Sequence, residues 1–188
     1  MSDDQWKQHL MLARTVAGAL SPADCEAVKQ AALAAGLSRS MVRTSKRLKA
    51  SGQRTSYQAV LPRTPELEWL YERMLAVGNK VNAEHWRFAL TGIETLQVLR
   101  YRPRQRFKWH HDVAPGSGRK VTCVVNLAPP GSYWRGRLEL MAPHQDHALT
   151  PLQGSATLFP SYIMHRATAP WWGERWSLVA WFTGPDLV

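Results

Sequence analysis

The sequence predicts a mainly β protein of the α+β class, in which helices from the N-terminal half pack on one sheet of a jelly-roll (cupin-like) core. Two observations carry this prediction. From Glu94 onward, short apolar runs alternate with turns marked by Pro, Gly and Asp, as in an antiparallel double sheet. Before Glu94, two stretches carry helix start signals. The 188 residues suffice for one sizeable core, so we expect a single domain, with helical support and a basic loop at 1–92 and the jelly-roll core at 93–188.

The first predicted elements are a short strand and a helix. Residues 8–16 fit a strand, although a helix also fits them. The helix over residues 23–35 has clear ends. Ser21 suits the N-cap, Pro22 suits the first helical position, and Gly36 can end the helix.

A basic segment, a second helix and seven strands complete the predicted elements. Residues 38–56 are polar and rich in Arg and Lys, and we expect a mobile loop there that short strands can flank. The second helix begins after Thr64 and Pro65 and runs to about Asn82, with an apolar face. The strands are expected at residues 94–101, 107–112, 120–127, 136–141, 148–152, 155–160 and 175–183.

Three residues of the strand region form a candidate metal site. His110 and Asp112 are two positions apart, so in a strand both side chains face the same way, whereas His111 faces the other way. His165 follows far downstream, after a Phe-Pro-Ser lead-in. Two imidazoles and one carboxylate make the facial triad that binds Fe(II) and leaves open coordination positions. We therefore interpret His110, Asp112 and His165 as iron ligands.

Arg175 lies ten residues after His165 and is the candidate anchor for a co-substrate. Arg175 and Ser177 share strand parity and are expected to point into the barrel together. A buried arginine needs an anionic partner, and a carboxylate can accept two parallel hydrogen bonds from it. The distal carboxylate of 2-oxoglutarate would fill this role, with a further hydrogen bond from Ser177.

A second triplet, His144-Gln145-Asp146, has the same spacing as the candidate ligands, and His147 follows it. This cluster lies between Pro143 and Pro151, in what we expect to be a loop between strands. Loops hold metal ligands less firmly than strands do, so we interpret the cluster as a solvated loop.

Net charge and hydropathy indicate which partners and which cell compartment to expect. The net charge is +10 with a pI near 10.1, which favours acidic partners such as nucleic acid or an anionic substrate without choosing between them. No apolar run approaches the length of a membrane span, and the N-terminus lacks the basic and then apolar order of a signal peptide. We therefore expect a cytoplasmic protein without a membrane partner.

At these motifs the chain resembles the prolyl-4-hydroxylase-like branch of the 2-oxoglutarate/Fe(II)-dependent dioxygenases, and in particular its small bacterial and phage members. The segments that carry the resemblance are residues 20–25, 94–101, 107–112, 119–122, 133–140, 159–165 and 173–177. The resemblance implies a double-stranded β-helix, another name for this jelly roll. It also implies His110, Asp112 and His165 as iron ligands and Arg175 as the 2-oxoglutarate anchor.

The resemblance assigns two further residues to the co-substrate pocket. Tyr101 matches a family tyrosine near the co-substrate, although an ordinary strand aromatic is an equal reading. Asn126 stands where prolyl hydroxylases proper often place a tyrosine, and it could donate one hydrogen bond. The family often has Gly-Gly where this chain has Arg135 and Gly136. These departures leave the iron site intact but predict a different pocket and argue against assuming a prolyl substrate.

The reaction implied is hydroxylation of an unactivated C–H bond, with 2-oxoglutarate and O2 consumed, succinate and CO2 released, and ascorbate as the reductant. We expect the entrance to be lined by the basic loop and by Trp109, Trp134, Arg135 and Arg137. The substrate is either a small metabolite that can be anionic or a prolyl or other residue of a peptide or protein. The oligomeric state is left open.

Two alternatives belong to other classes of protein. A basic nucleic-acid-binding protein would use the alternating cations Arg100, Arg102, Arg104, Arg106 and Lys108, but Pro103 interrupts that stripe. No arginine follows Arg175, whereas nucleic-acid demethylases of the superfamily usually carry a second one. The other alternative is a jelly roll that binds a metal without catalysis.

Overall fold

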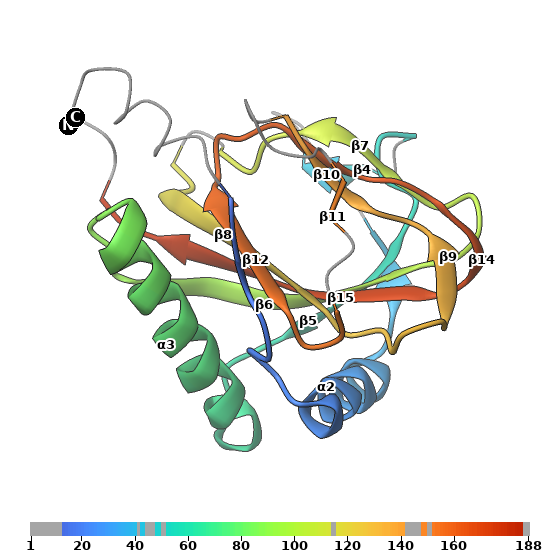
Figure 1. Ribbon diagram of the computed structural model, residues 1–188, viewed down its shortest axis with the longest axis horizontal. Helices are drawn as coiled ribbons and strands as arrows, with labels where there is room; N and C mark the ends of the chain where they lie inside the picture. Colours follow the sequence, from blue (N-terminus) through green and yellow to red (C-terminus); the bar gives the residue numbers. More distant parts are fainter. Residues whose placement is uncertain are drawn as a thin grey trace.

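Two antiparallel sheets face each other, and two helices lie against one of them (Figure 1). The computed structural model describes residues 13–40, 42–43, 48–49, 52–113, 116–141, 148–149 and 152–185. Within these ranges, no helix combines the length and the apolar character needed to cross a membrane.

The larger sheet has seven strands in the order β1-β12-β8-β15-β6-β5-β2. Its pairings are antiparallel throughout, and β15 lies between β8 and β6. The strands are β1 (Arg14–Val16), β2 (Ser38–Arg39), β5 (Tyr57–Leu61), β6 (Gly92–Tyr101), β8 (Arg119–Asn126), β12 (Ala156–Pro160) and β15 (Arg175–Thr183).

The smaller sheet has four strands in the order β11-β10-β13-β7, and two ribbons complete the strands. The four strands are β7 (Phe107–His110), β10 (Leu138–Leu140), β11 (Ala148–Leu149) and β13 (His165–Ala167). The ribbons pair β9 (Tyr133–Arg135) with β14 (Pro170–Gly173) and β3 (Val42–Arg43) with β4 (Leu48–Lys49). From β6 to β15 the chain passes repeatedly between the two main sheets, which is the winding of a double-stranded β-helix. The predicted fold class is confirmed.

The helices are α2 (Pro22–Ala35) and α3 (Glu68–His85), with a 3-10 turn, η1 (Pro65–Leu67), before α3. The start of α2 is a capping box: the Ser21 hydroxyl accepts from the Asp24 N–H at 3.1 Å, and Asp24 Oδ2 accepts from the Ser21 N–H at 2.9 Å. Gly36, with φ 83°, ends the helix in a conformation that favours glycine. The second helix runs three residues beyond the predicted end at Asn82.

Alternation along β15 separates two layers of core. Trp176, Leu178, Ala180 and Phe182 face the helices and join a cluster with residues of α2 and α3. Val179 and Trp181 face the interval between the sheets, where a second cluster forms. Arg175 and Ser177 share the inward parity of these two residues, so the larger sheet presents an apolar face to the helices and a partly polar face to the interior.

β2 and β5 are short strands at the two ends of the basic segment, as expected. Five other observed strands were not predicted: β3 and β4 within that segment, and β9, β13 and β14. Three of them are only three or four residues long, too short to show alternation, and β14 begins with a proline. The predicted strand at 107–112 ends at His110, so Asp112 follows the strand instead of ending it. The predicted strand at 136–141 shrinks to Leu138–Leu140. Of the predicted strand at 148–152, the structure shows Ala148–Leu149, and residues 150–151 lie outside the described part.

Candidate metal centre and co-substrate pocket

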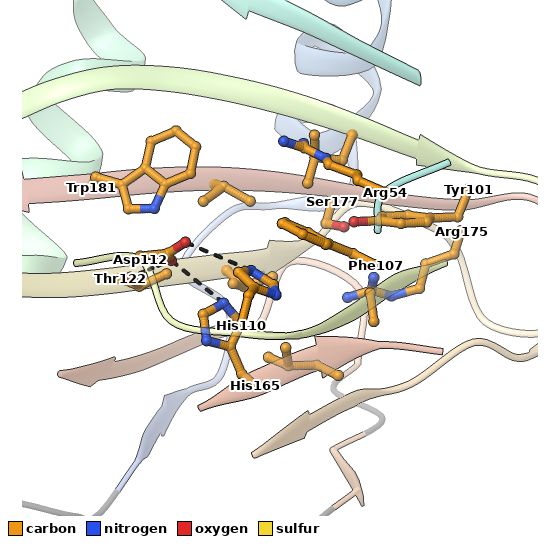
Figure 2. A pocket seen from close by; sticks show the side chains of 15 residues that line it. Arg54, Tyr101, Phe107, His110, Asp112, Thr122, His165, Arg175, Ser177 and Trp181 are labelled. Atoms are coloured by element: carbon orange, nitrogen blue, oxygen red, sulfur yellow. Dashed lines mark hydrogen bonds and ion pairs between the residues drawn. The ribbon is translucent and has the colours of Figure 1, made fainter. Parts of the chain in front are cut away.

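His110, Asp112 and His165 meet between the sheets, although His165 is far from the other two in sequence (Figure 2). β7 and β13 are neighbours in the smaller sheet, with His110 directly opposite His165 in the register. One ligand-type atom from each residue lies within 4.8 Å of those of the others. Asp112 Oδ1 lies 3.7 Å from His110 Nε2, and Asp112 Oδ2 lies 3.5 Å from His165 Nε2.

The backbone fixes which nitrogen of each ring faces the centre. His110 Nδ1 lies 2.8 Å from the Lys108 carbonyl oxygen, and His165 Nδ1 lies 2.9 Å from the Ile163 carbonyl oxygen. A carbonyl only accepts, so each Nδ1 carries a proton, and Nε2 is the ring nitrogen that faces Asp112 and can bind a metal. Metal-bound histidines are oriented in this way in proteins, so the three residues fit a divalent metal ion.

The charge states also suit metal binding. Burial, together with the neighbouring His165, lowers the pKa of His110 to about 4, so the ring is neutral at pH 7. Burial opposes ionisation of Asp112, but His165 and His110 outweigh it and hold the pKa of Asp112 below its usual range. A neutral imidazole and an ionised carboxylate are the forms that bind metals.

Polar groups from the larger sheet hold Asp112 in place. The Thr122 hydroxyl of β8 donates to Asp112 Oδ2 at 2.8 Å and lies 3.0 Å from the Ser161 hydroxyl. The Asp112 backbone N–H donates to the Ser161 carbonyl at 2.9 Å. The Trp181 indole N–H faces the same carboxylate without reaching hydrogen-bond geometry (Figure 2). Asp112, just beyond the end of β7 of the smaller sheet, is thus held in place by the larger sheet.

At the other end of the cavity, Arg175 and Ser177 lie on β15 opposite Tyr101 and Leu99 of β6. Arg175 is 3% exposed and its guanidinium lies 5.5 Å from the centre of the Tyr101 ring, but it has no hydrogen bond or ion pair with another described residue. The buried Ser177 hydroxyl also lacks a hydrogen-bond partner among the described residues. An unpaired cation and an unpaired hydroxyl side by side fit a carboxylate such as that of 2-oxoglutarate.

Two further cavity residues were not expected from the sequence. Phe107 stacks on His110 with ring centres 3.4 Å apart, and the Arg54 guanidinium lies 5.0 Å from the centre of the Phe107 ring. Arg54 comes from the basic segment, of which residues 41, 44–47 and 50–51 lie outside the described part. The segment holds several arginines and lysines, so no sequence signal distinguished Arg54 from the others.

Other predicted site residues lie outside the cavity wall. The Asn126 amide donates to the Ala128 carbonyl at 3.3 Å and accepts from the Ala128 N–H at 3.4 Å. Trp109 faces away from His110 and packs on Arg166, with the guanidinium 4.7 Å from its ring centre. Trp134 and Arg135 on β9, and Arg137 after it, are exposed. Their predicted roles toward co-substrate or substrate stay predictions, and the His144 cluster lies outside the described residues.

The exposed end of β9 and β14 carries a small aromatic group. The rings of Trp134 and Trp171 meet edge to face at 5.0 Å, and the Arg135 guanidinium lies 4.1 Å from the Trp171 ring centre. Trp134, Trp171 and the neighbouring Trp172 are each about half exposed. Trp134 and Arg135 are thus neighbours on the surface, and their place at the entrance stays a prediction.

Comparison with known proteins shows which family part of this chain resembles. Residues 96–183 match the sequence model of the 2OG-Fe(II) oxygenase superfamily, a segment that includes both histidines, Asp112 and Arg175. A PKHD-type hydroxylase from Crocosphaera subtropica is 31% identical over 94 residues, which cover 47% of this chain and 42% of that protein. This chain thus spans less than half the length of that relative.

Solved structures share the fold over nearly the whole chain. A prolyl-4-hydroxylase from Pseudomonas putida superposes with a TM-score of 0.75 at 17% identity and covers 96% of each chain. A prolyl hydroxylase from Trichoplax adhaerens, in complex with a hypoxia inducible factor peptide fragment, gives a TM-score of 0.77 at 17% identity and covers 96% of this chain and 86% of its own. Residues 96–183 are thus similar to the 2OG-Fe(II) oxygenase superfamily, and nearly the whole chain shares its fold with solved prolyl hydroxylases.

Proposed function

We propose that the protein is a 2-oxoglutarate- and Fe(II)-dependent dioxygenase that hydroxylates a C–H bond. The observation that carries this proposal is that the Nε2 atoms of His110 and His165 and the Asp112 carboxylate meet within 4.8 Å, while a backbone carbonyl lies at the Nδ1 of each ring. A structural cluster of polar residues would not need both rings in the same metal-binding orientation. The family match of residues 96–183 supports the same conclusion.

Residues at one end of the cavity would bind the metal, and residues at the other end would bind the distal carboxylate of 2-oxoglutarate. When bound, Fe(II) with 2-oxoglutarate and O2 supplies oxidative decarboxylation to succinate and CO2 coupled to hydroxylation. His110, Asp112 and His165 would hold the metal, and Thr122 keeps the carboxylate in one orientation. Arg175 and Ser177 would bind the distal carboxylate of 2-oxoglutarate. Between these ends, aliphatic side chains exclude water from the reacting groups: Leu99, Val124, Leu138, Ala167 and Val179.

An optical titration without oxygen tests the proposal. Fe(II) and 2-oxoglutarate added to the apoprotein should produce the visible metal-to-ligand charge-transfer band of the chelate. We expect His110→Ala to abolish the band and Arg175→Ala to weaken it. His111→Ala, which removes an exposed neighbouring histidine, should leave it unchanged. The absence of a band in folded, metal-loaded wild-type protein would refute the proposal.

A peptide or protein residue is the second candidate substrate, after a small metabolite. The Trichoplax relative is a prolyl hydroxylase captured with a peptide fragment, and its fold covers nearly all of this chain. Succinate release stimulated by proline-containing peptides, and not by their free amino acids, would favour this candidate. The exposed surface formed by Trp134, Arg135 and Arg137 is where we propose that such a peptide would lie.

The cell compartment and the remaining cofactors follow from the proposed chemistry. Fe(II) needs a reducing environment, with ascorbate as the proposed reductant. Cys25 and Cys123 are both free thiols, which fits a compartment in which disulfides do not persist. We therefore propose a cytoplasmic enzyme. Because Arg54 of the N-terminal part enters a cavity built by the C-terminal part, we also propose that residues 1–92 and 93–188 form one domain.

A further inference from the structure

Arg54 is held in the cavity by a short pairing with the strand that carries His110. It forms an isolated antiparallel bridge with Phe107 of β7. On either side of it, the Thr55 N–H donates to the Arg106 carbonyl at 3.0 Å and the Lys108 N–H donates to the Gln53 carbonyl at 2.9 Å. The Gln53 side-chain amide also donates to the Trp109 carbonyl at 3.0 Å. The position of Arg54 is thus set by the backbone of the metal-binding strand.

Among the residues that the structure describes, the hydrogen-bond and ring partners of Arg54 are all neutral. Its Nε donates to the Ser56 hydroxyl at 3.2 Å and one terminal nitrogen donates to Gln97 Oε1 at 3.0 Å, while the Phe107 ring covers one face. Arg54 is only 8% exposed. A guanidinium has five N–H donors, so protons remain for the cavity that it lines. A buried cation without a carboxylate partner costs stability unless a ligand supplies the charge.

The sum of the charges in the loaded cavity indicates the charge that this ligand should carry. Among the described residues that line the cavity, the charged ones are Arg54, Arg175 and Asp112, and the two histidines are neutral when they bind a metal. Fe(II) and the dianion 2-oxoglutarate cancel each other. Asp112 then offsets one of the two arginines, so the loaded site keeps one positive charge.

We infer that the substrate carries a carboxylate, and that Arg54 is the residue that binds it beside the reacting carbon. This inference rests on the proposed function, because the balance counts the metal and 2-oxoglutarate. Arg175 already has Ser177 beside it for the co-substrate. Arg54 enters from a different element, and Figure 2 shows the two guanidinium groups on opposite sides of Tyr101.

Matched acids and amides test the inference. The probes are acetate, butanoate and benzoate against acetamide, butanamide and benzamide, each titrated without oxygen into protein saturated with Fe(II) and 2-oxoglutarate. Perturbation of the charge-transfer band gives the dissociation constant. In wild type at least one acid should bind about tenfold or more tightly than its amide, since a buried charge pair contributes at least that much.

Two variants separate a substrate role from the other roles of an arginine. Arg54→Gln keeps hydrogen-bonding capacity without charge, and should lose the acid preference while its affinity for 2-oxoglutarate stays within about threefold of wild type. Arg54→Lys should keep part of the preference. The control is Arg100→Gln, because Arg100 stacks on Tyr57 and Trp176 outside the cavity; it should behave as wild type.

The outcomes are distinguishable. Equal binding of every acid and its amide in wild type would overturn the inference, as would an acid preference that survives in Arg54→Gln. If Arg54→Gln instead loses 2-oxoglutarate affinity, Arg54 is a second co-substrate anchor and the inference is wrong. Loss of the charge-transfer band in wild type itself would refute the proposed function, and the inference with it. Circular dichroism of each variant checks that it is folded.

Discussion

The proposed binding of 2-oxoglutarate depends on two single residues at the far end of the cavity. Arg175 and Ser177 are buried, adjacent on one face of β15, and unpaired with any described residue. An unpaired buried cation such as Arg175 destabilises the fold that contains it, so we expect both residues to be present for ligand binding and not for stability. The geometry therefore predicts graded effects of substitution at the two positions.

Replacing Arg175 should weaken 2-oxoglutarate binding more than replacing Ser177. Truncation of one partner of a buried charge pair costs about 2–5 kcal/mol, so Arg175→Ala should raise the dissociation constant by roughly 30-fold or more. Arg175→Lys keeps the charge but loses the two-pronged contact, so a smaller loss is expected. Ser177→Ala removes one neutral hydrogen bond, worth about 0.5–1.5 kcal/mol, or up to roughly tenfold.

The measurement is the anaerobic charge-transfer titration with 2-oxoglutarate at saturating Fe(II). Arg102→Ala is the matched control, because Arg102 lies just past the Arg175 partner Tyr101 but pairs on the surface with Glu174 at 2.7 Å. Equal losses for Arg175→Ala and Arg102→Ala would show that general charge, and not a carboxylate contact at Arg175, governs affinity.

Thr122 is expected to matter for the metal and not for the co-substrate. Its hydroxyl donates to Asp112 Oδ2 at 2.8 Å, and Thr122→Val removes that donor with little change in shape. Loss of an outer partner of a metal ligand typically lowers metal affinity 10- to 100-fold. Thr157→Val, at a fully buried threonine of β12 outside the cavity wall, is the control. Calorimetric titration with Co(II) would measure both; unchanged affinity in Thr122→Val would mean that Asp112 needs no support.

The sequence predicted the ligands but not their supports, and the reason is physical. His110 and Asp112 follow from period-two alternation, and His165 and Arg175 from their spacing, all of which are local properties of the chain. Thr122, Phe107 and Arg54 act through contacts across the sheets, which only the packed structure creates. The Asn126 side chain bonds the backbone of Ala128, a contact that the sequence also did not predict.

At the scale of elements, the larger sheet is positioned by the helices on its outer face. α3 crosses β15 at Gly78, where a Cβ would lie 2.2 Å from the Phe182 ring. Phe182 is fully buried between β15 and the helices, so its ring has little room to move. The absence of a side chain at Gly78 thus lets α3 approach the sheet that carries Arg175 and Ser177.

Gly78→Ala should therefore destabilise the protein, which is the opposite of the usual effect of this substitution on the stability of a helix. In an exposed helix interior, alanine in place of glycine stabilises by about 1 kcal/mol. Here overpacking should cost about 1–3 kcal/mol, seen as a lower midpoint in urea or on heating. Asn79→Ala, at the next and exposed position, should leave stability nearly unchanged. A higher midpoint for Gly78→Ala would mean that α3 does not press on Phe182.

Helices and strands were predictable where they are long and where caps or alternating apolar residues mark them. α2, α3, β6, β8 and β15 follow their predicted ranges closely because caps or extended alternation mark them. β9, β13 and β14 are too short for such a signal, and their pairing depends on partners distant in sequence. The sheet that carries both histidines is therefore the less predictable of the two.

At the scale of the whole molecule, ion pairs offset part of the positive charge. Arg119 bonds Glu94 through two nitrogens, Arg63 pairs with Glu68, and Arg166 with Glu139. The cationic stripe from Arg100 to Lys108 is not one straight strand, because β6 ends at Tyr101 and a turn precedes β7. These arrangements weaken the case for a nucleic-acid-binding surface along that stripe.

The two sheets meet at the site, which couples ligand binding to global stability. The histidines belong to the smaller sheet, whereas Arg175 and Ser177 belong to the larger one. A 2-oxoglutarate molecule held at both ends would link the two sheets. Any ligand that binds only the folded state stabilises it, by about 2.7 kcal/mol at 100 times its dissociation constant.

Thermal unfolding without oxygen should reveal this link. Fe(II) and 2-oxoglutarate together should raise the midpoint by roughly 5–10 °C in a chain of this size, and by more than the separate shifts combined, because the keto acid needs the metal at one end. In Arg175→Ala the shift from Fe(II) alone should persist, whereas the added shift from 2-oxoglutarate should shrink, since the contact with the larger sheet is gone. An equal shift from 2-oxoglutarate with and without Fe(II) would contradict a shared site, because it would place the co-substrate away from His110, Asp112 and His165.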